Sequence, residues 1–271
     1  MSIQDAARNL RVIDDAFFRL LAEKPEVCQE ILRTILDDPK LEVINVDAQS
    51  LVQSMHREVY LDAECKLGNG NICNIEMQKG RKEDDIRRTR FHASALTANR
   101  TEKGTNFKDI PDVTVVYITE YDALGNGQAV THVSRCMETI EGFLPLDDGE
   151  DIIFANTVVK DGSKVSELLS LMVKTEAFND ARFPGLSDAV GYYKLTRGGF
   201  MEVCKIIRDL NQQMYGDQYV VAREEGRQEG RISTIMQFIN KGHSEEEANA
   251  VFECTKEELE AVREMLAAAG K

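Results

Sequence analysis

Residues 57–67 and 71–78 alternate between apolar and polar side chains, and this period of two predicts a pair of β-strands. The loop between them, residues 68–70, reads Gly-Asn-Gly, a favoured hairpin connection because glycine readily supplies the positive φ angle that the turn needs. Side chains two positions apart on a strand point the same way. The polar face of the predicted hairpin therefore carries Asp62 on the first strand, and Glu76 and Gln78 on the second.

The length of the loop also predicts the register of the hairpin. Leu67 is expected to pair with Asn71, which places Asp62 opposite Glu76. Directly opposed side chains have Cβ atoms roughly 4.5–5.5 Å apart, and two like charges at that distance destabilise a sheet unless they are neutralised. Magnesium neutralises such a pair, and it takes its remaining ligands from water and substrate phosphates, so the pattern predicts a metal site and a phosphodiester substrate. The alternative is a solvated polar face on an ordinary hairpin.

The apolar spacing in the first 160 residues predicts an α/β fold with the element order αβββαβ, built around a mixed central sheet flanked by helices. We expect helices at 14–36 and 84–100, strands at 41–47, 57–67, 71–78 and 113–119, and a further strand at 152–159 at the edge of the sheet. The domain organisation predicted from these patterns is a core at 1–160, a helical extension packed on it at 161–215, and a helical tail at 216–271.

The formal net charge of −14 is unusual for a protein that binds nucleic acid. The charge is unevenly distributed, because residues 79–108 contain nine Lys/Arg against four Asp/Glu. Arg87, Arg88 and Arg90 open a predicted helix whose start is marked by Asp84 and Asp85, and these arginines are the candidate phosphate-binding residues. A solvated helix face, with the arginines paired to Glu83, Asp84 and Asp85, is the alternative.

Length and composition favour a cytoplasmic protein that does not span a membrane. The N-terminus lacks the basic start and apolar run of a signal peptide, and no stretch approaches the roughly 18 apolar residues that a membrane span needs. The six cysteines are scattered mostly among apolar residues, which predicts buried small side chains rather than a zinc or redox site. None of the four histidines shows metal-like spacing with another, so no catalytic histidine is expected.

The tail at 216–271 carries signals of helix packing. Gly226 and Gly230 would share one face of a helix, where a second helix can approach closely, although a flexible linker is an equal alternative. Capping boxes at 244–247 and 255–258 predict two short helices after Gly242, and so a three-helix unit. Between residues 222 and 271 there are seven Lys/Arg and eleven Asp/Glu, which favours contact with protein, such as self-association, over contact with DNA.

The residues around the hairpin resemble a known nuclease motif. Leu61-Asp62, a short turn and then the string Asn-Ile-Glu-Met-Gln at 74–78 are similar to the central motif of the PD-(D/E)XK nuclease superfamily, and more closely to the Rpn family of recombination-promoting nucleases and transposases. The Asp-Asp-Ala-Phe-Phe string at 14–18, the basic run at 87–92 and the strand at 113–119 follow in family order. The resemblance covers about residues 14–160, and Gln78 stands where the superfamily usually has lysine.

The resemblance implies a PD-(D/E)XK core and a metal-dependent DNA endonuclease that hydrolyses phosphodiester bonds, with magnesium as the cofactor and manganese as a substitute. It implies that Asp62 and Glu76 bind the metal and that DNA, expected to be double-stranded, is the substrate, with RNA as the open alternative and recombination or transposition as the wider role. Superfamily members often add an acid from the first helix, and Glu30 is the candidate here.

The amide of Gln78 cannot exchange a proton at neutral pH, so we expect it to orient a water or a phosphate oxygen rather than act as a base. The catalytic set expected from the sequence is therefore Asp62, Glu76 and Gln78. The alternative function is a catalytically silent nuclease-fold protein that acts as a protein-binding or regulatory module, through its acidic surface and its helical tail, which is also where we expect any homo-oligomer to form.

Overall fold

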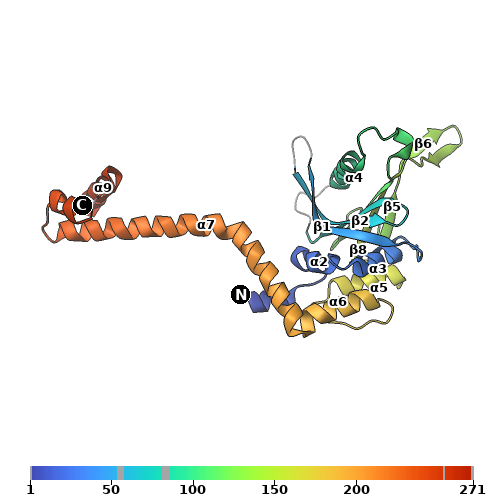
Figure 1. Ribbon diagram of the computed structural model, residues 1–271, viewed down its shortest axis with the longest axis horizontal. Coiled ribbons are helices and arrows are strands. Elements are labelled where there is room, and N and C mark those ends of the chain that lie inside the picture. Colours follow the sequence, from blue (N-terminus) through green and yellow to red (C-terminus); the bar gives the residue numbers. More distant parts are fainter. Residues whose placement is uncertain (1, 54–57, 81–85, 253, 270–271) are drawn as a thin grey trace. The chain divides into compact units, whose positions relative to one another are not determined.

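A computed structural model describes residues 2–53, 58–80, 86–252 and 254–269, and it contains a mixed sheet in the strand order β1-β2-β3-β4-β8-β5 (Figure 1). Neighbouring strands β1, β2 and β3 are antiparallel, β3, β4 and β8 are parallel, and β5 is antiparallel to β8. The bounds of these strands are Val43–Gln53 for β1, Glu58–Leu67 for β2, Ile72–Gln78 for β3, Val113–Thr119 for β4, Val130–Val133 for β5 and Glu150–Asn156 for β8.

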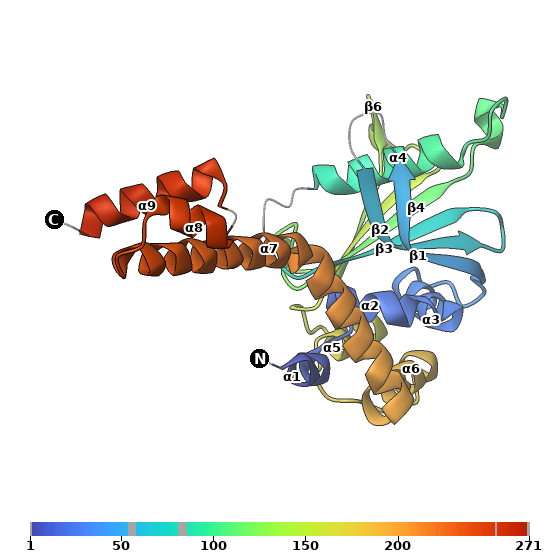
Figure 2. The ribbon, with the colours of Figure 1, turned by 60° about the vertical axis from the view of Figure 1, so that its left-hand side comes forward.

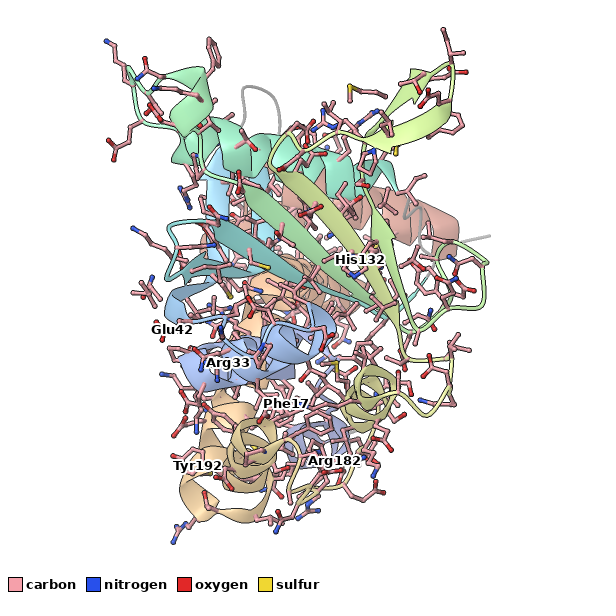
Figure 3. The ribbon with its side chains drawn as sticks, turned by 90° about the vertical axis from the view of Figure 1, so that its right-hand side faces the viewer. Phe17, Arg33, Glu42, His132, Arg182 and Tyr192 are labelled. Atoms are coloured by element: carbon pink, nitrogen blue, oxygen red, sulfur yellow. The ribbon has the colours of Figure 1, made fainter. Side chains whose placement is uncertain are left out.

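Helices cover both faces of the sheet, which makes an α/β/α arrangement of layers (Figures 1 and 3). One face is covered by α2 (Asp15–Ala22), α3 (Pro25–Ile35) and α5 (Lys164–Met172), with α6 (Pro184–Leu195) packed beyond α3. The other face is covered by α4 (Arg87–Arg100). Each layer has its own apolar cluster, and the central strands β3 and β4 are buried on both sides, as expected for parallel strands. The structure thus confirms the predicted α/β fold.

Most predicted elements are present, and the differences have local causes. The helix expected over 14–36 is divided into α2 and α3 because Pro25 occupies the first helical position of α3 and cannot continue a preceding helix. The strand expected at the sheet edge, β8, is instead an interior strand, since the short strand β5 pairs with its outer side. The starting point predicted for α4, Asp84 and Asp85, lies outside the described residues, as do the pairings expected with them and with Glu83.

The hairpin between β2 and β3 has the predicted register. The Leu67 N–H donates to the Asn71 carbonyl at 2.9 Å, and the turn closes with Gly70, whose φ angle is +92°. The paired residues beyond the turn are Lys66 with Ile72, Cys65 with Cys73, Glu64 with Asn74, and Ala63 with Ile75.

A second, two-stranded sheet stands apart from the first, formed by β6 (Cys136–Thr139) and β7 (Gly142–Pro145). Its residues are exposed, and Cys136 is among them. This corrects the expectation that the cysteines are buried, which does hold for Cys28, Cys65, Cys73 and Cys204. Two further short elements, missed from the sequence, are α1 (Ile3–Asn9) and the 3-10 turn η1 (Phe107–Asp109).

Helix α7 (Arg197–Asn240) follows α6 directly. Gly199 lies in its first turn, where an added Cβ atom would come within 2.4 Å of the Tyr192 carbonyl oxygen, so only glycine allows this approach. The helix runs without interruption through Gly226 and Gly230, which rules out the flexible linker that was the alternative there. By its internal contacts the chain divides into two compact units, residues 1–208 and 209–271.

The second unit is a three-helix arrangement of the end of α7, α8 (Glu245–Phe252) and α9 (Lys256–Ala269) (Figure 2). Its small core contains Ile235, Ala248 and Val262, one from each helix. Both predicted capping boxes form, with Glu247 N–H donating to Ser244 and Glu258 N–H donating to Thr255. Among the described helices, none combines the length and the apolar character needed to cross a membrane.

Candidate active site

Asp62 lies where strand β2 separates from β3. The β2–β3 ladder ends at the pair Ala63 and Ile75, whereas β2 remains paired with β1 as far as Glu58. Beyond this pair, the N–H of Met77 on β3 donates to the side-chain carboxylate of Asp62 at 2.8 Å, rather than to a backbone carbonyl of β2. The β1–β2 pair rises from here along α4 (Figures 1 and 2). We call this point of separation, with Asp62 on one strand and Glu76 on the other, the fork.

Strand β1 contains one residue with a strained backbone conformation, next to Asp62 of β2. Gln49 has a φ angle of +63°, and it is missing from the β1–β2 ladder between the pairs Ala48–Ala63 and Ser50–Leu61. A non-glycine residue in this conformation costs roughly 1–2 kcal/mol, and such residues gather at functional sites. Gln49 lies beside Asp62 in this register, and its Nε2 is 3.5 Å from Oδ1 of Asp15. Gln49 therefore connects this part of β1 to the start of α2.

Glu76 projects from β3 toward α4 and is almost completely buried, with an exposed fraction of 2%. Its Oε1 accepts a hydrogen bond from Asn74 Nδ2 at 2.7 Å, and the same oxygen is 3.2 Å from Nδ1 of His92 on α4. Asp62 and Glu76 follow directly after the last ladder pair, Ala63 and Ile75, and the charge of Glu76 is close enough to raise the pKa of Asp62. The two carboxylates therefore meet at the fork from adjacent strands.

The electrostatics of the fork show that its carboxylates act on one another. Burial raises the pKa of Asp62 well above its usual range, and the negative charges of Glu76 and Asp15 raise it further. The Met77 N–H and the nearby charge of Arg88 oppose this shift without cancelling it. A carboxyl group whose pKa is raised in this way favours its neutral, protonated form unless a cation stabilises the charged form.

Asp15, the first residue of α2, is the acid that sequence reasoning missed. Its side chain still reaches solvent, but the protein packed around it raises the pKa of Asp15, and the charge of Glu76 raises it further against the opposing charge of Arg19. Asp15 belongs to the Asp-Asp-Ala-Phe-Phe string that supported the family resemblance, so the signal was present. The sequence could not show which of its two acids faces the strands.

The neighbouring Asp14 has a structural role. Burial alone would raise the pKa of this carboxyl, but the ammonium of Lys79 at 2.6 Å and hydrogen bonds from Arg11 lower it. Arg11 also forms an ion pair with Glu120, directly after β4. This network ties the start of α2 to the ends of β3 and β4, and it fixes Asp15 beside the fork.

Gln78 ends β3 close to the fork. Its amide Nε2 donates to the Gly80 carbonyl at 2.8 Å, so the nitrogen is held by the turn that follows the strand. The side chain is half-buried. No described contact joins Gln78 to Asp62 or Glu76, and its expected role toward a water or phosphate stays a prediction.

Two other acids, the expected accessory acid Glu30 and Glu64 of β2, are occupied elsewhere. Glu30, the expected accessory acid of the first helix, accepts the N–H groups of Gly185 at 3.2 Å and Leu186 at 2.8 Å, and thereby caps α6. Glu64 forms an ion pair with Arg100 and accepts a hydrogen bond from Ser50. Both carboxylates are committed to structural contacts, and no described contact joins either of them to Asp62 or Glu76. Asp15 is the helix acid whose charge raises the pKa of Asp62.

The three candidate phosphate-binding arginines, Arg87, Arg88 and Arg90, are exposed on the first turn of α4. Arg88 is near enough to Asp62 for its charge to lower the pKa of that carboxyl. Positive charge therefore lies close to Asp62.

The donor set fits a divalent cation that keeps most of its water. Among the described residues, no three His, Cys, Asp or Glu side chains are close enough together to form a complete protein cage for a metal. Magnesium does not require one, since it is commonly held by one or two carboxylates plus water and substrate phosphates. Burial and the charge of Glu76 raise the pKa of both Asp62 and Asp15, and such an ion would stabilise these two carboxyl groups in their charged form.

A separate hollow of about 660 Å³ lies between α3, β5 and α5, away from all of these residues. Arg33 and His132 line it, and Figure 3 shows them on α3 and on β5. None of the acids at the fork contributes to its wall, so its size alone does not make it the candidate active site.

Comparison with known protein families gives one result. A family model described as PD-(D/E)XK nuclease family transposase matches residues 11–160, which is more than half of the chain. No curated protein and no solved structure was found to match. The matched segment begins before α2 and ends after β8, so it contains Asp15, both strands of the fork and α4.

Proposed function

The chain belongs to the PD-(D/E)XK nuclease family, and from this membership and the arrangement of the fork we propose that it is a magnesium-dependent DNA endonuclease. Nucleases of this family generally use divalent metals, and the family implies a DNA substrate. The observation that supports the proposal most directly is the proximity of Asp62 to Glu76, where burial, and after it the charges of the acidic neighbours, raise the pKa of Asp62.

In this proposal Asp62 and Glu76 bind the metal, and Asp15 adds negative charge from the start of α2. Asp62 is held by the Met77 N–H, and Glu76 by Asn74, so each carboxylate has one oxygen fixed by the protein and one oxygen left for the cation. Positions fixed in advance in this way reduce the reorganisation needed during the reaction. When bound, magnesium, or manganese in its place, would activate a water and neutralise charge on the scissile phosphate.

The remaining roles belong to side chains around the fork. Gln78 would orient the attacking water or a phosphate oxygen through its amide, which can donate or accept hydrogen bonds but cannot take up a proton. Arg87, Arg88 and Arg90 would contact phosphates of double-stranded DNA on either side of the cut. With so few phosphates neutralised, binding would be weak and would decrease as salt increases. Recombination or transposition is the wider role that we propose for this cleavage.

The proposal is tested by incubating supercoiled plasmid with the full-length protein in magnesium, in manganese and in EDTA. We expect nicked or linear products only with metal, and a loss of rate of about 100-fold or more in Asp62→Ala and in Glu76→Ala, since a bound metal contributes several kcal/mol to such reactions. Asp47→Ala, which removes an exposed carboxylate of β1 outside the fork, is the matched control and should cleave normally. Cleavage that survives in both fork variants would refute the assignment.

One observation favours a second candidate function. Gln78 replaces the usual lysine, and its amide nitrogen is bound to the Gly80 carbonyl. A nuclease fold without activity, acting as a protein-binding or regulatory module, would have these features, and its acidic helical tail would then be the functional part. Wild-type protein that leaves the plasmid intact with either metal would favour this second function.

A further inference from the structure

Behind the fork, three polar side chains are enclosed together between β3 and α4. Asn74, Glu76 and His92 have exposed fractions of 0%, 2% and 4%. They are surrounded by apolar neighbours of the α4 layer, including Ala93, Ala95 and Leu96. Polar groups in such an environment are expected to satisfy one another, because each buried group without a partner costs about 1–3 kcal/mol.

The cluster is directed at one oxygen of Glu76. Asn74 Nδ2 donates to Oε1 at 2.7 Å, and His92 Nδ1 approaches the same oxygen to 3.2 Å. No described residue donates a hydrogen bond to the other oxygen, Oε2. The two oxygens of the carboxylate therefore have different surroundings, one turned toward the protein interior and one left for the fork.

Two atoms of the cluster lack a hydrogen-bond partner among the described residues, Nδ1 of His92 and Oδ1 of Asn74. The 3.2 Å separation between His92 Nδ1 and Glu76 Oε1 is short enough for a hydrogen bond, but the ring N–H does not point along it. Both atoms are buried and lie close together, so a hydrogen bond from His92 Nδ1 to Glu76 Oε1 requires only a change in their relative orientation.

We infer that Asn74 and His92 are positioning residues that hold Oε1 of Glu76 and so direct Oε2 toward the cation shared with Asp62. This inference rests on the proposed metal-dependent function. Asn74 Nδ2 and His92 Nδ1–H would together hold Oε1, and Oε2 would stay available to a bound cation. Partners that orient a metal-binding side chain typically affect metal affinity by 10–100-fold, although they do not touch the metal themselves.

The first test is calorimetric titration of Mn²⁺ into full-length protein, without DNA, so that binding is measured apart from cleavage. His92→Leu removes the donor and fills the space, and we expect its affinity for Mn²⁺ to fall at least tenfold. His92→Asn places an amide donor near the position of Nδ1, and its affinity should stay within about threefold of wild type. Thr89→Val, a buried change one turn earlier on α4, is the matched control and should bind normally.

These variants separate positioning from packing. If His92→Asn binds Mn²⁺ as weakly as His92→Leu, or if His92→Leu binds like wild type, the inference is overturned. Thermal unfolding in EDTA identifies any variant that has lost its fold, and Asn74→Ser then supplies a second, smaller change in the same cluster with the same expected loss of affinity.

The second test needs no metal. In ¹⁵N-edited spectra of the imidazole groups at pH 8.5, His92 is identified among the four histidines by its absence from His92→Asn. We expect its proton on Nδ1, as donation to Glu76 requires. A proton on Nε2 would overturn the inference. If wild type binds no Mn²⁺, the metal-dependent function fails instead, and the position of this proton alone decides whether His92 holds Glu76.

Discussion

Asp62 combines its proposed role in metal binding with a cost to folding. The same burial and neighbouring charges that prepare it for a cation raise its pKa, which means that the metal-free native state is destabilised by keeping this group ionised at neutral pH. Natural proteins commonly retain such a cost where function depends on it.

Replacing this carboxylate should therefore stabilise the metal-free protein. In Asp62→Asn the side-chain oxygen can still accept the Met77 N–H, but the repulsion from Glu76 and Asp15 is gone. We expect the free energy of unfolding, measured by urea titration in EDTA, to rise by about 1 kcal/mol. Glu64→Gln, which weakens the ion pair with Arg100, should shift it the other way. A lower stability of Asp62→Asn would contradict this account of the fork.

The sequence predicts single residues well where local rules decide their placement. The period of two and the turn length bring Asp62 and Glu76 together, because both depend only on nearby backbone geometry. Asp15 and His92 could not be predicted, since their positions depend on how α2 and α4 pack against the sheet. The capping role of Glu30 could not be predicted for the same reason, because its partners are 155 and 156 residues away along the chain.

Helix α6 begins without a capping side chain of its own. Its N-cap position is Phe183, followed by Pro184. The N–H groups of the next two residues lie too early in the helix to have a helical partner, and they donate to Glu30 of α3. This contact joins two helices on one side of the sheet. A carboxylate at a helix start also interacts favourably with the helix dipole.

Glu30→Ala should consequently lower stability and leave cleavage intact. We expect a loss of about 1–2 kcal/mol in the free energy of unfolding, the usual effect of removing a cap, with the plasmid cleaved at the wild-type rate by the folded fraction. Glu26→Ala, an exposed acid on the same helix, should lose much less. A large drop in cleavage at full stability would return Glu30 to the active site.

Tyr193 of α6 gives a pH-dependent test of the same packing. Burial raises its pKa to about 12, and its hydroxyl donates to the Leu20 carbonyl of α2 at 3.2 Å. In the unfolded chain the hydroxyl of Tyr193 ionises near pH 10. Its contribution to the free energy of unfolding is therefore complete below pH 10 and is lost as the pH rises from 10 to 12, by an amount on the order of 2–3 kcal/mol.

The measurement is the difference in unfolding free energy between wild type and Tyr193→Phe at several pH values from 8 to 12. Wild type should lose stability across the upper part of this range more steeply than the variant, which has no hydroxyl to ionise. Tyr192→Phe changes a more exposed ring and should follow wild type more closely. Parallel curves for wild type and Tyr193→Phe would show that the hydroxyl is not protected from solvent.

Among the elements, those with strong local signals were predicted best. Strand β4 has the predicted bounds, since a continuous β-branched run fits a strand buried on both faces. The short strands β5, β6 and β7 were missed because four residues carry too little periodicity to be recognised. The edge position predicted for β8 was wrong because β5, the strand that pairs with its outer side, was missed.

For the whole molecule, the division at residues 208 and 209 separates the part that contains the fork from a small acidic unit. We propose that this second unit mediates self-association. Val251 on α8 and Met265 on α9 are large apolar side chains that are more than half exposed, at 61% and 51%, and they are the candidate contact residues.

Sedimentation tests this proposal. Full-length protein should sediment as an oligomer, while Val251→Glu combined with Met265→Glu, and separately a chain that ends at Gly216, should sediment as monomers. Plasmid cleavage by the double variant shows whether activity depends on association. A full-length protein with the same mass in solution as the shortened chain would refute the role of the tail.

At this scale the fold class and the family could be predicted, because the matched segment contains the elements with the clearest patterns. The predicted boundaries at 160 and 215 remain predictions about folding units. The continuity of α7 through residues 226 and 230 was one of two alternatives that the sequence left open, since glycines favour a break when they are considered locally.

The exposed hairpin of β6 and β7 offers a practical consequence. Of the six cysteines, Cys136 alone is exposed, and four are buried. A maleimide fluorophore will thus attach there first, without any engineered cysteine, and the dye will report from the end of the sheet where β8 begins rather than from the fork.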